Sequence, residues 1–285
     1  MAWGLAGPED RKEEYPMNDR QDQPSGDKPL TLAIDVGGSH LKAGIVDESG
    51  VLVPGPAGLR DRVETPKGAP PPNIVAALVG LAKPLGHFDR ISIGFPGVVR
   101  GGIVLTAPNL GNEAWHGFPL AKAIAEALGK PARMLNDASV QGLGAIGGQG
   151  IELVLTLGTG MGFALFDDGR LAPHLEMSQH PARKKMTYDE YIGDAARREI
   201  GPRHWSKRVH RVIGVMKKVV GYDCLYLGGG NARHVAAPLP PDVHTVSNEA
   251  GVTGGVRLWD RRLDAMFGGP APAFLCASSL LRDRG

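Results

Sequence analysis

The sequence predicts an α/β protein, and two observations carry that prediction. Short apolar runs typical of buried strands alternate along the chain with longer segments that have helical spacing. Glycine-rich turns directly follow several of these apolar runs, at the points where strands would end. A chain of 285 residues can bury a substantial core, either as one large domain or as two smaller ones.

The predicted elements follow one another without a repeat at a fixed solenoid period. Residues 1–29 are polar, charged and interrupted by proline and glycine, which is typical of a disordered leader. The first half then predicts two strands around a Gly-Gly turn in 30–53, a helix at 73–85, a strand at 90–99, an extended piece at 101–110 and a helix at 118–129. The second half predicts a strand at 131–137, a helix at 138–148, a hairpin at 153–170, a mostly helical segment at 183–220, a strand from 224 and a closing helix at 254–267.

Composition disfavours several classes of function. The net charge of +2 provides no overall field that would attract nucleic acid or a membrane surface. No apolar run is long enough to span a bilayer, and the N-terminus lacks an apolar signal core. The two cysteines, Cys224 and Cys276, lie far apart in the sequence and lack the spacing of metal ligands, so we expect reduced thiols. We therefore expect a cytoplasmic protein that binds neither nucleic acid nor membrane.

Three glycine-rich turns are the main functional signal. They are Gly37-Gly38 after the first strand, Gly158-Thr159-Gly160-Met161-Gly162 after a central strand, and Gly228-Gly229-Gly230 followed by Asn231 after a late strand. Backbone N–H groups in such turns can face a phosphate. Three turns of this kind favour a nucleotide that is held at several points. The spacing matches neither a P-loop nor a Rossmann fingerprint.

The central turn is ambiguous when read alone. In LVLTLGTGMGFALFDDGR the apolar character of a strand stops at the glycines and resumes at Phe163. Such a turn suits either a tight hairpin or a close approach of a ligand to the backbone.

Asp35 stands at the end of the first predicted strand, beside Gly37 and Gly38. A carboxylate there can orient a hydrated Mg²⁺ that neutralises phosphate charge, and Ser39 and Lys42 could add a hydroxyl and an ammonium group. The alternative is that Asp35 caps a turn and that Lys42 is a solvated strand residue.

Several motifs, taken in order, resemble the ROK family of sugar kinases and regulators. They are DVGGSHLKAGIVD, GFPGVV, LNDA, TLGTGMGFALFDDGRL and YLGGGNAR, and WSKRVHRVI with the short region before it is similar to the polyphosphate glucokinase branch. The resemblance covers about residues 30–260. It implies an actin/hexokinase-like fold of two RNase H-like lobes with a central cleft. A phosphoryl donor would lie on the glycine turns, and a hexose would lie against the smaller lobe.

The resemblance also implies a domain division. We expect a smaller N-terminal lobe at 30–135, a larger C-terminal lobe at 136–267 and a loose tail at 268–285. The closing helix at 254–267 would pack back on the N-terminal lobe. A homodimer is expected.

The acceptor site is implied by Leu135-Asn136-Asp137-Ala138. Asp137 matches the family's catalytic aspartate, which accepts the proton of the sugar hydroxyl, and Asn136 would hold neighbouring hydroxyls. The alternative for Asn-Asp before a helix is an N-cap. Further candidates for sugar contact are Asn109, which matches a family position or forms an Asx-turn, and Gly97, where Pro-Gly is also an ordinary turn.

The family's sugar-binding Glu-x-Gly-His is altered in this chain. Glu176 matches the glutamate, but Gln179 replaces the histidine and His180 follows one residue later. A glutamine can still donate and accept hydrogen bonds to hydroxyls, so the change bears on affinity or sugar choice more than on phosphoryl transfer. Glu190 is a further candidate for sugar contact, or a surface charge. No cysteine occurs in 181–195, so the family's usual zinc site is not expected.

The donor is expected to be ATP or inorganic polyphosphate, with Mg²⁺. Thr159 would face the transferred phosphoryl group, and Gly230 and Asn231 would approach the nucleotide. Eleven Lys/Arg against four Asp/Glu between Arg183 and Lys218 could guide a polyanion, or could form a solvated cationic helix face.

The sequence therefore predicts a hexose kinase, in the first place a glucokinase acting on the 6-hydroxyl of glucose. Gln179, together with Ser39-His40 after the first glycine turn, motivates a second hypothesis of a sugar-binding protein with weak catalysis. A sugar-responsive repressor is disfavoured, because the 29 residues before the first strand show no pair of amphipathic helices.

Overall fold

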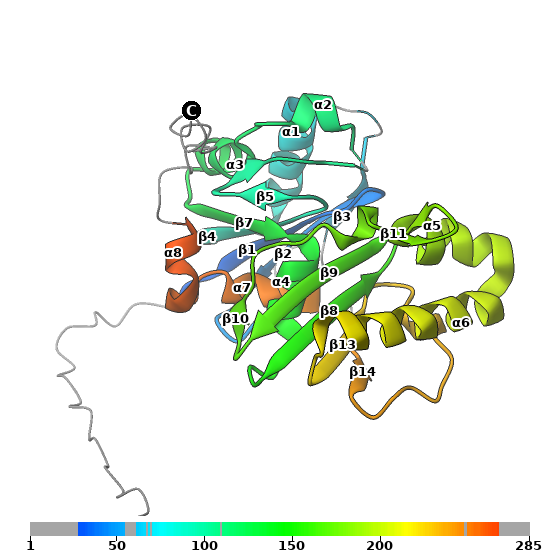
Figure 1. The fold of residues 1–285 in the computed structure, drawn as a ribbon. Coiled ribbons are helices and arrows are strands. Elements are labelled where there is room, and N and C mark those ends of the chain that lie inside the picture. Colours follow the sequence, from blue (N-terminus) through cyan, green and yellow to red (C-terminus); the bar gives the residue numbers. More distant parts are fainter. Residues whose placement is uncertain are drawn as a thin grey trace, which may run out of the picture.

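The strand order repeats in two five-stranded sheets, which form the framework of the computed structural model (Figure 1). The model describes residues 28–267 except 55–60, 67, 69, 109 and 248–249. The order in the first sheet is β3 (Asp61–Glu64), β2 (His40–Val46), β1 (Thr31–Val36), β4 (Arg90–Phe95) and β7 (Ala132–Asn136). The order in the second is β10 (Arg170–Leu171), β9 (Met161–Asp167), β8 (Ile151–Leu157), β13 (Cys224–Gly228) and β14 (Val243–Thr245).

Each sheet begins with two antiparallel pairings and ends with two parallel ones. The predicted α/β fold of two RNase H-like lobes is thus confirmed. The predicted hairpins around both glycine turns also form, as β1–β2 and β8–β9.

Burial explains why β1 is almost continuously apolar. Leu32, Ile34 and Val36 pack in the core on one face of the first sheet, whereas Ala33 packs against Val46 on the other face. Successive side chains of a strand point to opposite faces, so a strand that is covered on both faces needs apolar residues throughout. Asp35 is the exception, and it lies at the cavity described below.

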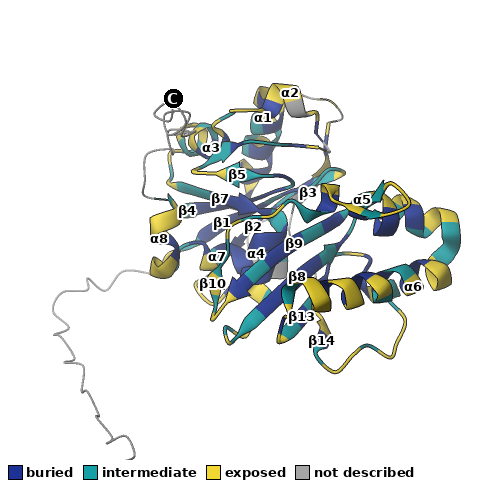
Figure 2. Cartoon of the chain, in the orientation of Figure 1, coloured by how far each residue is buried: buried dark blue, intermediate teal, exposed yellow. Residues whose placement is uncertain are grey.

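Helices cover the outer face of each sheet (Figures 1 and 2). On the first sheet these are α1 (Pro71–Ala82) and α3 (Leu120–Leu128), with the short elements η1 (Lys83–Leu85), β5 (Val99–Arg100), β6 (Ile103–Val104) and α2 (Asn112–Trp115) nearby in sequence. On the second sheet these are α5 (Tyr188–Ile192) and α6 (Asp194–Val220). Gly129 ends α3 in the left-handed conformation, as its predicted glycine stop requires.

Two helices lie between the sheets. The side chains of α4 (Asp137–Ala145) pack against the second sheet, where Val140 and Leu143 meet Val154 and Phe166. The other helix, α7 (Ala250–Arg257), lies close to α4: a Cβ added at Gly254 would come within 1.9 Å of the Val140 carbonyl oxygen. On its opposite side, the Gly255 carbonyl accepts a hydrogen bond of 2.6 Å from Ser92 Oγ of β4.

The segment predicted as mostly helical at 183–220 begins instead with a hairpin. Strands β11 (Pro181–Arg183) and β12 (Met186–Thr187) pair through a turn at Lys184 and Lys185, which both have positive φ. Thr187 then caps α5, so the helical part starts only at Tyr188. Helix α6 is kinked at Gly201, whose φ of 76° lies outside the helical region, just before Pro202.

The closing helix predicted at 254–267 is also corrected. It begins earlier, at Ala250, and ends at Arg257. Asp260 then caps a separate 3-10 turn, η4 (Arg261–Leu263), with its side chain on Arg262 N, and α8 (Asp264–Phe267) follows. The remaining short elements are η2 (Met177–Gln179) and η3 (Ala232–His234). Among the helices of the described residues, none is both long and apolar enough for a membrane span.

Candidate functional site

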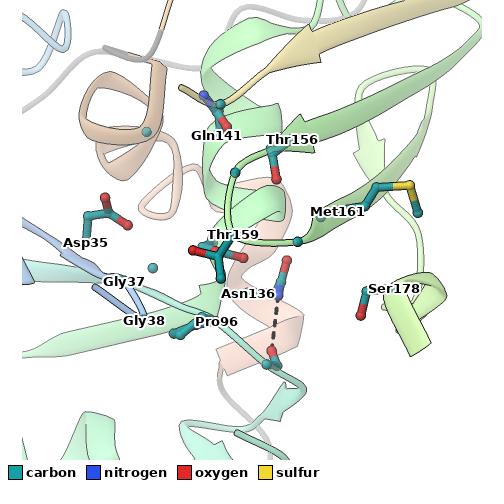
Figure 3. Close-up of a pocket in the computed structure, with 18 of the residues that line it drawn as sticks. Asp35, Gly37, Gly38, Pro96, Asn136, Gln141, Thr156, Thr159, Met161 and Ser178 are labelled. Atoms are coloured by element: carbon teal, nitrogen blue, oxygen red, sulfur yellow. Dashed lines mark hydrogen bonds between the residues drawn. The ribbon is translucent and has the colours of Figure 1, made fainter. Parts of the chain in front are cut away.

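A cavity of about 470 Å³ opens where the ends of β1, β4, β7, β8 and β9 meet α4 (Figure 3). Most of the residues predicted from the sequence line it. They are Asp35, Gly37, Gly38, Lys42, Gly97, Asn136, Asp137, Gly158, Thr159, Gly160, Gly162, Glu176, Gly229 and Gly230. The predicted residues that do not line it are Ser39, Gln179, His180, Glu190, Gly228 and Asn231. Asn109 lies outside the described residues.

The first glycine turn brings an ion pair to the cavity. Asp35 and Lys42 are cross-strand partners in the β1–β2 hairpin, and Lys42 Nζ donates to Asp35 Oδ2 at 2.8 Å. Gly37 serves the turn itself, because a Cβ there would lie 2.7 Å from the His40 carbonyl oxygen. Ser39 is exposed and points no group into the cavity wall; its carbonyl accepts a hydrogen bond from Thr65 N.

The glycines of the second turn differ in why the structure needs them, which bears on whether the turn is a tight hairpin or a place where a ligand approaches the backbone. Gly160 and Gly162 are required by packing: an added Cβ would lie 2.1 Å from Asp189 Oδ1 at Gly160, and 2.2 Å from Thr156 Oγ1 at Gly162. At Gly158 an added Cβ would meet nothing within 4 Å. Of these three glycines, which all line the cavity, only Gly158 has open space around an added Cβ.

The third glycine turn is tied to the second. Asn231 donates from Nδ2 to the Gly158 carbonyl and to Asp194 Oδ1, both at 3.2 Å, and its backbone N–H donates to Leu157. Gly229 has a φ of 81°, and a Cβ there would lie 2.4 Å from the Leu157 carbonyl oxygen. Asn231 thus holds two turns together, and of the predicted residues here only Gly229 and Gly230 reach the cavity.

Asn136 is the N-cap of α4, the alternative that the sequence also allowed. Its Oδ1 accepts from the backbone N–H groups of Ala138 and Ser139, and its Nδ2 donates to the Gly97 carbonyl at 3.1 Å. The side chain is buried, and these bonds use most of its hydrogen-bonding capacity. It therefore fixes Asp137, the first residue of α4, against the loop that contains Gly97.

Asp137 has the most perturbed carboxyl group of the cavity. Burial raises its pKa to about 7, and the negative charges of Asp35 and Glu176 act in the same direction. A hydrogen bond from Ala138 N to Oδ1, 2.8 Å long, opposes the shift. A pKa in this range suits a group that exchanges a proton near neutral pH.

The loop of residues 172–180, called the acceptor loop after the sugar contacts predicted in it, presents Glu176 to the cavity. Its carboxylate accepts from Ser178 Oγ on Oε1 and lies 3.5 Å from His174 Nε2 through Oε2. Burial opposes the charge, yet the hydrogen bonds from His174 and Ser178 hold the pKa of Glu176 below its ordinary value. Glu176 is therefore an anion that can accept hydrogen bonds from a ligand.

Gln179, the replacement for the family histidine, does not line the cavity. Its Nε2 donates to Asp189 Oδ2 at 3.0 Å and to Ser178 Oγ at 3.1 Å. Asp189 does line the cavity, and its Oδ1 accepts from Met161 N at 2.7 Å. Burial raises the pKa of Asp189, and the charge of Glu176 adds to the shift.

Glu190 and His180 have structural roles. Glu190 completes the capping box of α5: its side chain accepts from Thr187 N at 2.8 Å, while its own N–H donates to Thr187 Oγ1. His180 is exposed, and its carbonyl accepts from Tyr188 N. Neither side chain is part of the cavity wall.

The basic segment of 183–218 lies away from the cavity. None of its eleven Lys and Arg residues lines the wall. Arg197 and Arg198 pair with Asp194, Lys217 pairs with Asp242, and Arg208 and Arg211 donate to Tyr191. The structure thus places the basic segment outside the cavity wall, and guidance of a polyanion toward the cavity stays a prediction.

Sequence reasoning missed several residues of the wall, most notably Asp189, Gln141, Arg62 and His174. For Asp189 a signal existed, since Thr187-x-x-Glu190 fits a capping box and assigns Glu190 to the helix start. Gln141 follows Asp137 by four residues and so shares its helix face. Arg62 is placed only by its pairing opposite Lys42, which no local pattern predicts.

Asp35 is the one predicted metal ligand, so its surroundings test whether Mg²⁺ fits. One carboxylate oxygen faces Lys42, and the described residues contain no group of three or more His, Cys, Asp or Glu that could hold a metal ion. Proteins commonly hold Mg²⁺ by one or two carboxylates together with substrate phosphates. Asp35 therefore fits a cation that arrives with a phosphate ligand, whose charge the cation would shield.

Two similar mixed sheets with a polar cavity where they meet define a two-lobed protein of the actin-like class. Comparison with known proteins gives the family: the model of the ROK family matches residues 31–173. A polyphosphate glucokinase from Mycobacterium leprae is 31% identical over 246 residues, which are 78% of this chain and 72% of that protein. The chain belongs to the ROK family.

Solved structures agree with this assignment. The inorganic polyphosphate/ATP-glucomannokinase from Arthrobacter sp. strain KM has a TM-score of 0.72 and 27% identity, covering 81% of this chain and 98% of that one. A ROK family glucokinase from Streptomyces griseus, in complex with glucose and AMPPNP, has a TM-score of 0.66 over 80% of this chain and 98% of that one. At 18% identity, this second likeness concerns the fold alone.

Proposed function

We propose that this protein is a hexose kinase, in the first place a glucokinase, which transfers a phosphoryl group from ATP or polyphosphate to the 6-hydroxyl of glucose. The names of its relatives support this activity, since they include a polyphosphate glucokinase and a polyphosphate/ATP-glucomannokinase. Asp137 is the general base in this proposal.

The observation that carries the proposal is the setting of Asp137. It begins a helix inside the cavity, between the first two glycine turns, and its pKa is raised to about 7. A base with a pKa near the working pH combines a useful fraction of carboxylate with a useful affinity for the proton. Asn136 fixes the position of this base through the N-cap.

The acceptor end favours an uncharged polyol. Glu176, Asp189 and Asp137 place three carboxyl groups on the wall of one cavity. Carboxylates accept hydrogen bonds from hydroxyl groups, and they repel an anionic sugar such as a sugar phosphate. A neutral hexose is therefore the matching class of acceptor.

The donor end favours a phosphate chain. Gly158 leaves room for the donor at the second turn, and Lys42 and Arg62 bring positive charge to the wall. Asp35 would hold Mg²⁺ through water, and the metal would supply charge neutralisation of the phosphates. Thr159 would contact the transferred group.

Transfer would then be an in-line displacement. The sugar oxygen forms a bond to the terminal phosphorus while the bond from that phosphorus to the bridging oxygen breaks. The proton of the hydroxyl passes to the Asp137 carboxylate, and the shortened donor leaves as the second product. Positioning and charge neutralisation would supply most of the rate, with closure of the two lobes excluding water.

A coupled assay tests the proposal with glucose, mannose and related hexoses, each with ATP and with polyphosphate. Activity is expected for at least one pair, and Asp137→Asn is expected to reduce it by about 10²-fold or more. The proposal fails if no hexose is phosphorylated faster than in the Asp137→Asn variant.

Gln179 supports the second candidate, a sugar-binding protein with weak catalysis. Its carboxamide bonds to Asp189 and Ser178, and Gln179 does not line the cavity. Gln179 therefore does not take the place of a histidine that contacts the sugar. Calorimetry separates the two candidates: glucose binding without turnover would favour the second. We also propose that the protein is cytoplasmic and forms a homodimer, and light scattering of the purified protein tests the dimer.

A further inference from the structure

Gln141 has a largely buried side chain whose amide bonds to no other described residue. It lies on α4, one helical turn after Asp137, and only 8% of its surface is exposed. Gln141 lines the cavity, and its carboxamide has no hydrogen-bond partner among the described residues. Its polar atoms are open to the cavity, unlike the fully buried Trp115 Nε1 and His174 Nδ1. A ligand in the cavity can therefore take over the hydrogen bonds that this amide otherwise makes to water.

The neighbours of Gln141 place it at the donor end. A Cβ added at Gly228 would lie 3.0 Å from its Cδ, Nε2 and Oε1, so the carboxamide rests directly against the third glycine turn. Figure 3 shows Gln141 and Thr156 at one end of the cavity, well separated from Ser178 of the acceptor loop. The amide therefore lies at the third glycine turn, remote from the proposed sugar.

Helix geometry sets the distance from the reacting centre. Residues four apart lie on one face of an α-helix, and Gln141 lies about 6 Å further along the axis than Asp137. Asp137 contacts the acceptor hydroxyl in the proposed reaction. Because Gln141 also rests against the third glycine turn, it lies on the side of Asp137 where the proposed donor would continue past the transferred phosphorus.

We propose that Gln141 binds the phosphate chain of the donor, with Nε2–H donating to an oxygen of a phosphate that is not transferred. This inference rests on the proposed kinase function and names a further binding residue within it. Hydrogen bonds to charged oxygens are among the stronger ones, and this bond would replace one that the amide otherwise makes to water in the cavity. Both ATP and polyphosphate present such an oxygen, so the contact serves either donor.

A purely structural role for Gln141 makes a different prediction. If the side chain only fills space beside Gly228, then Gln141→Leu, of similar size, leaves donor affinity unchanged. If it binds phosphate, Gln141→Leu weakens the donor selectively, and Gln141→Glu weakens it further through charge repulsion. Gln149→Leu is the matched control, because Gln149 is exposed and does not line the cavity.

The first test measures the KM of the donor and the KM of the sugar separately for the full chain. The second test measures donor binding by calorimetry, with AMPPNP and with polyphosphate, in variants that also carry Asp137→Asn. We expect Gln141→Leu to weaken donor binding about tenfold or more and to change the sugar KM less than twofold, while Gln149→Leu changes neither. Equal donor affinity of wild type and Gln141→Leu overturns the inference, as does an equal rise in both KM values. If Gln141→Leu does not fold, Gln141→Asn, with a shorter amide, replaces it with the same expectation.

The outcomes also separate this inference from the proposed function. Wild type that neither binds AMPPNP or polyphosphate nor phosphorylates any hexose overturns both. Wild type that binds and transfers normally, with Gln141→Leu indistinguishable from it, overturns only the role of Gln141.

Discussion

Gln179 donates a hydrogen bond to Asp189 at 3.0 Å, and through that bond the acceptor loop is fastened to helix α5. Asp189 carries the connection further, because its other oxygen accepts from Met161 N at the end of the second glycine turn. The residue that replaces the family histidine is thus part of a link between the proposed sugar site and the proposed donor site. A change of sugar affinity caused by this replacement would arise from the position of the loop.

Removing the carboxylate at this junction is expected to weaken sugar binding. In Asp189→Asn the amide can still accept from Met161 N, but its NH₂ group faces Gln179. The Gln179 carboxamide must then turn over and give up its bond to Ser178 Oγ, so the attachment of the loop is weakened. We expect the sugar KM to rise about tenfold with a small change in Tm, measured by steady-state kinetics and thermal unfolding. Glu190→Gln is the matched control, because glutamine also completes a capping box and Glu190 does not line the cavity. An equal rise of KM in the control would contradict the assignment.

The raised pKa of Asp137 predicts a pH profile. Because the carboxylate is the active form, kcat/KM should fall about tenfold for each pH unit below about 7 and level off above it. Glu176 contributes negative charge that raises this pKa, so in Glu176→Gln the midpoint should move to lower pH, even if the sugar KM also rises. The profile of kcat/KM between pH 5 and 9 provides the measurement. A midpoint near 4 in the wild type would show that Asp137 is not held as the structure places it.

The same pKa predicts that Asp137 destabilises the fold at high pH. The group binds its proton more tightly in the folded state, with a pKa of about 7 against an ordinary value of 3.8, so the unfolded chain releases the proton first as pH rises. Stability therefore falls between about pH 4 and pH 7. Asp137→Asn avoids the buried charge and should stabilise the protein by about 2–4 kcal/mol at pH 8, but not at pH 4. Urea unfolding at both pH values tests the difference, and a variant equally stable to wild type at pH 8 would contradict it.

The sequence predicted the β1–β2 and β8–β9 hairpins and the wall of the cavity well, because strand ends and glycine turns are local signals. The sequence was less informative where contacts between residues far apart in the chain determine the role of a side chain or the local backbone conformation. Asn231 carries the features of a nucleotide-binding residue, yet it bonds to Gly158 and Asp194, which lie far away in sequence. Similarly, the hairpin at Lys184 and Lys185 depends on two residues adopting positive φ, which their side chains do not favour in isolation. Asp189, and not Glu190, lines the cavity. The sequence contained a signal for this difference, because the capping box of Thr187 and Glu190 assigns Glu190 to the start of α5.

The two ends of the second glycine turn should respond differently to alanine, and this comparison tests the role of the turn most directly. In Gly160→Ala the new Cβ would lie 2.1 Å from Asp189 Oδ1, so the junction with Gln179 must shift, and we expect a loss of about 2–3 kcal/mol in unfolding free energy. In Gly158→Ala the Cβ meets nothing within 4 Å, so stability should stay within about 0.5 kcal/mol of wild type. Because Gly158 lines the cavity where the proposed donor approaches the backbone, we expect donor affinity to fall. Urea unfolding and calorimetry with AMPPNP measure the two effects. A Gly158→Ala variant with unchanged donor affinity would mean that the donor does not approach this backbone, and the turn would then be a hairpin and nothing more.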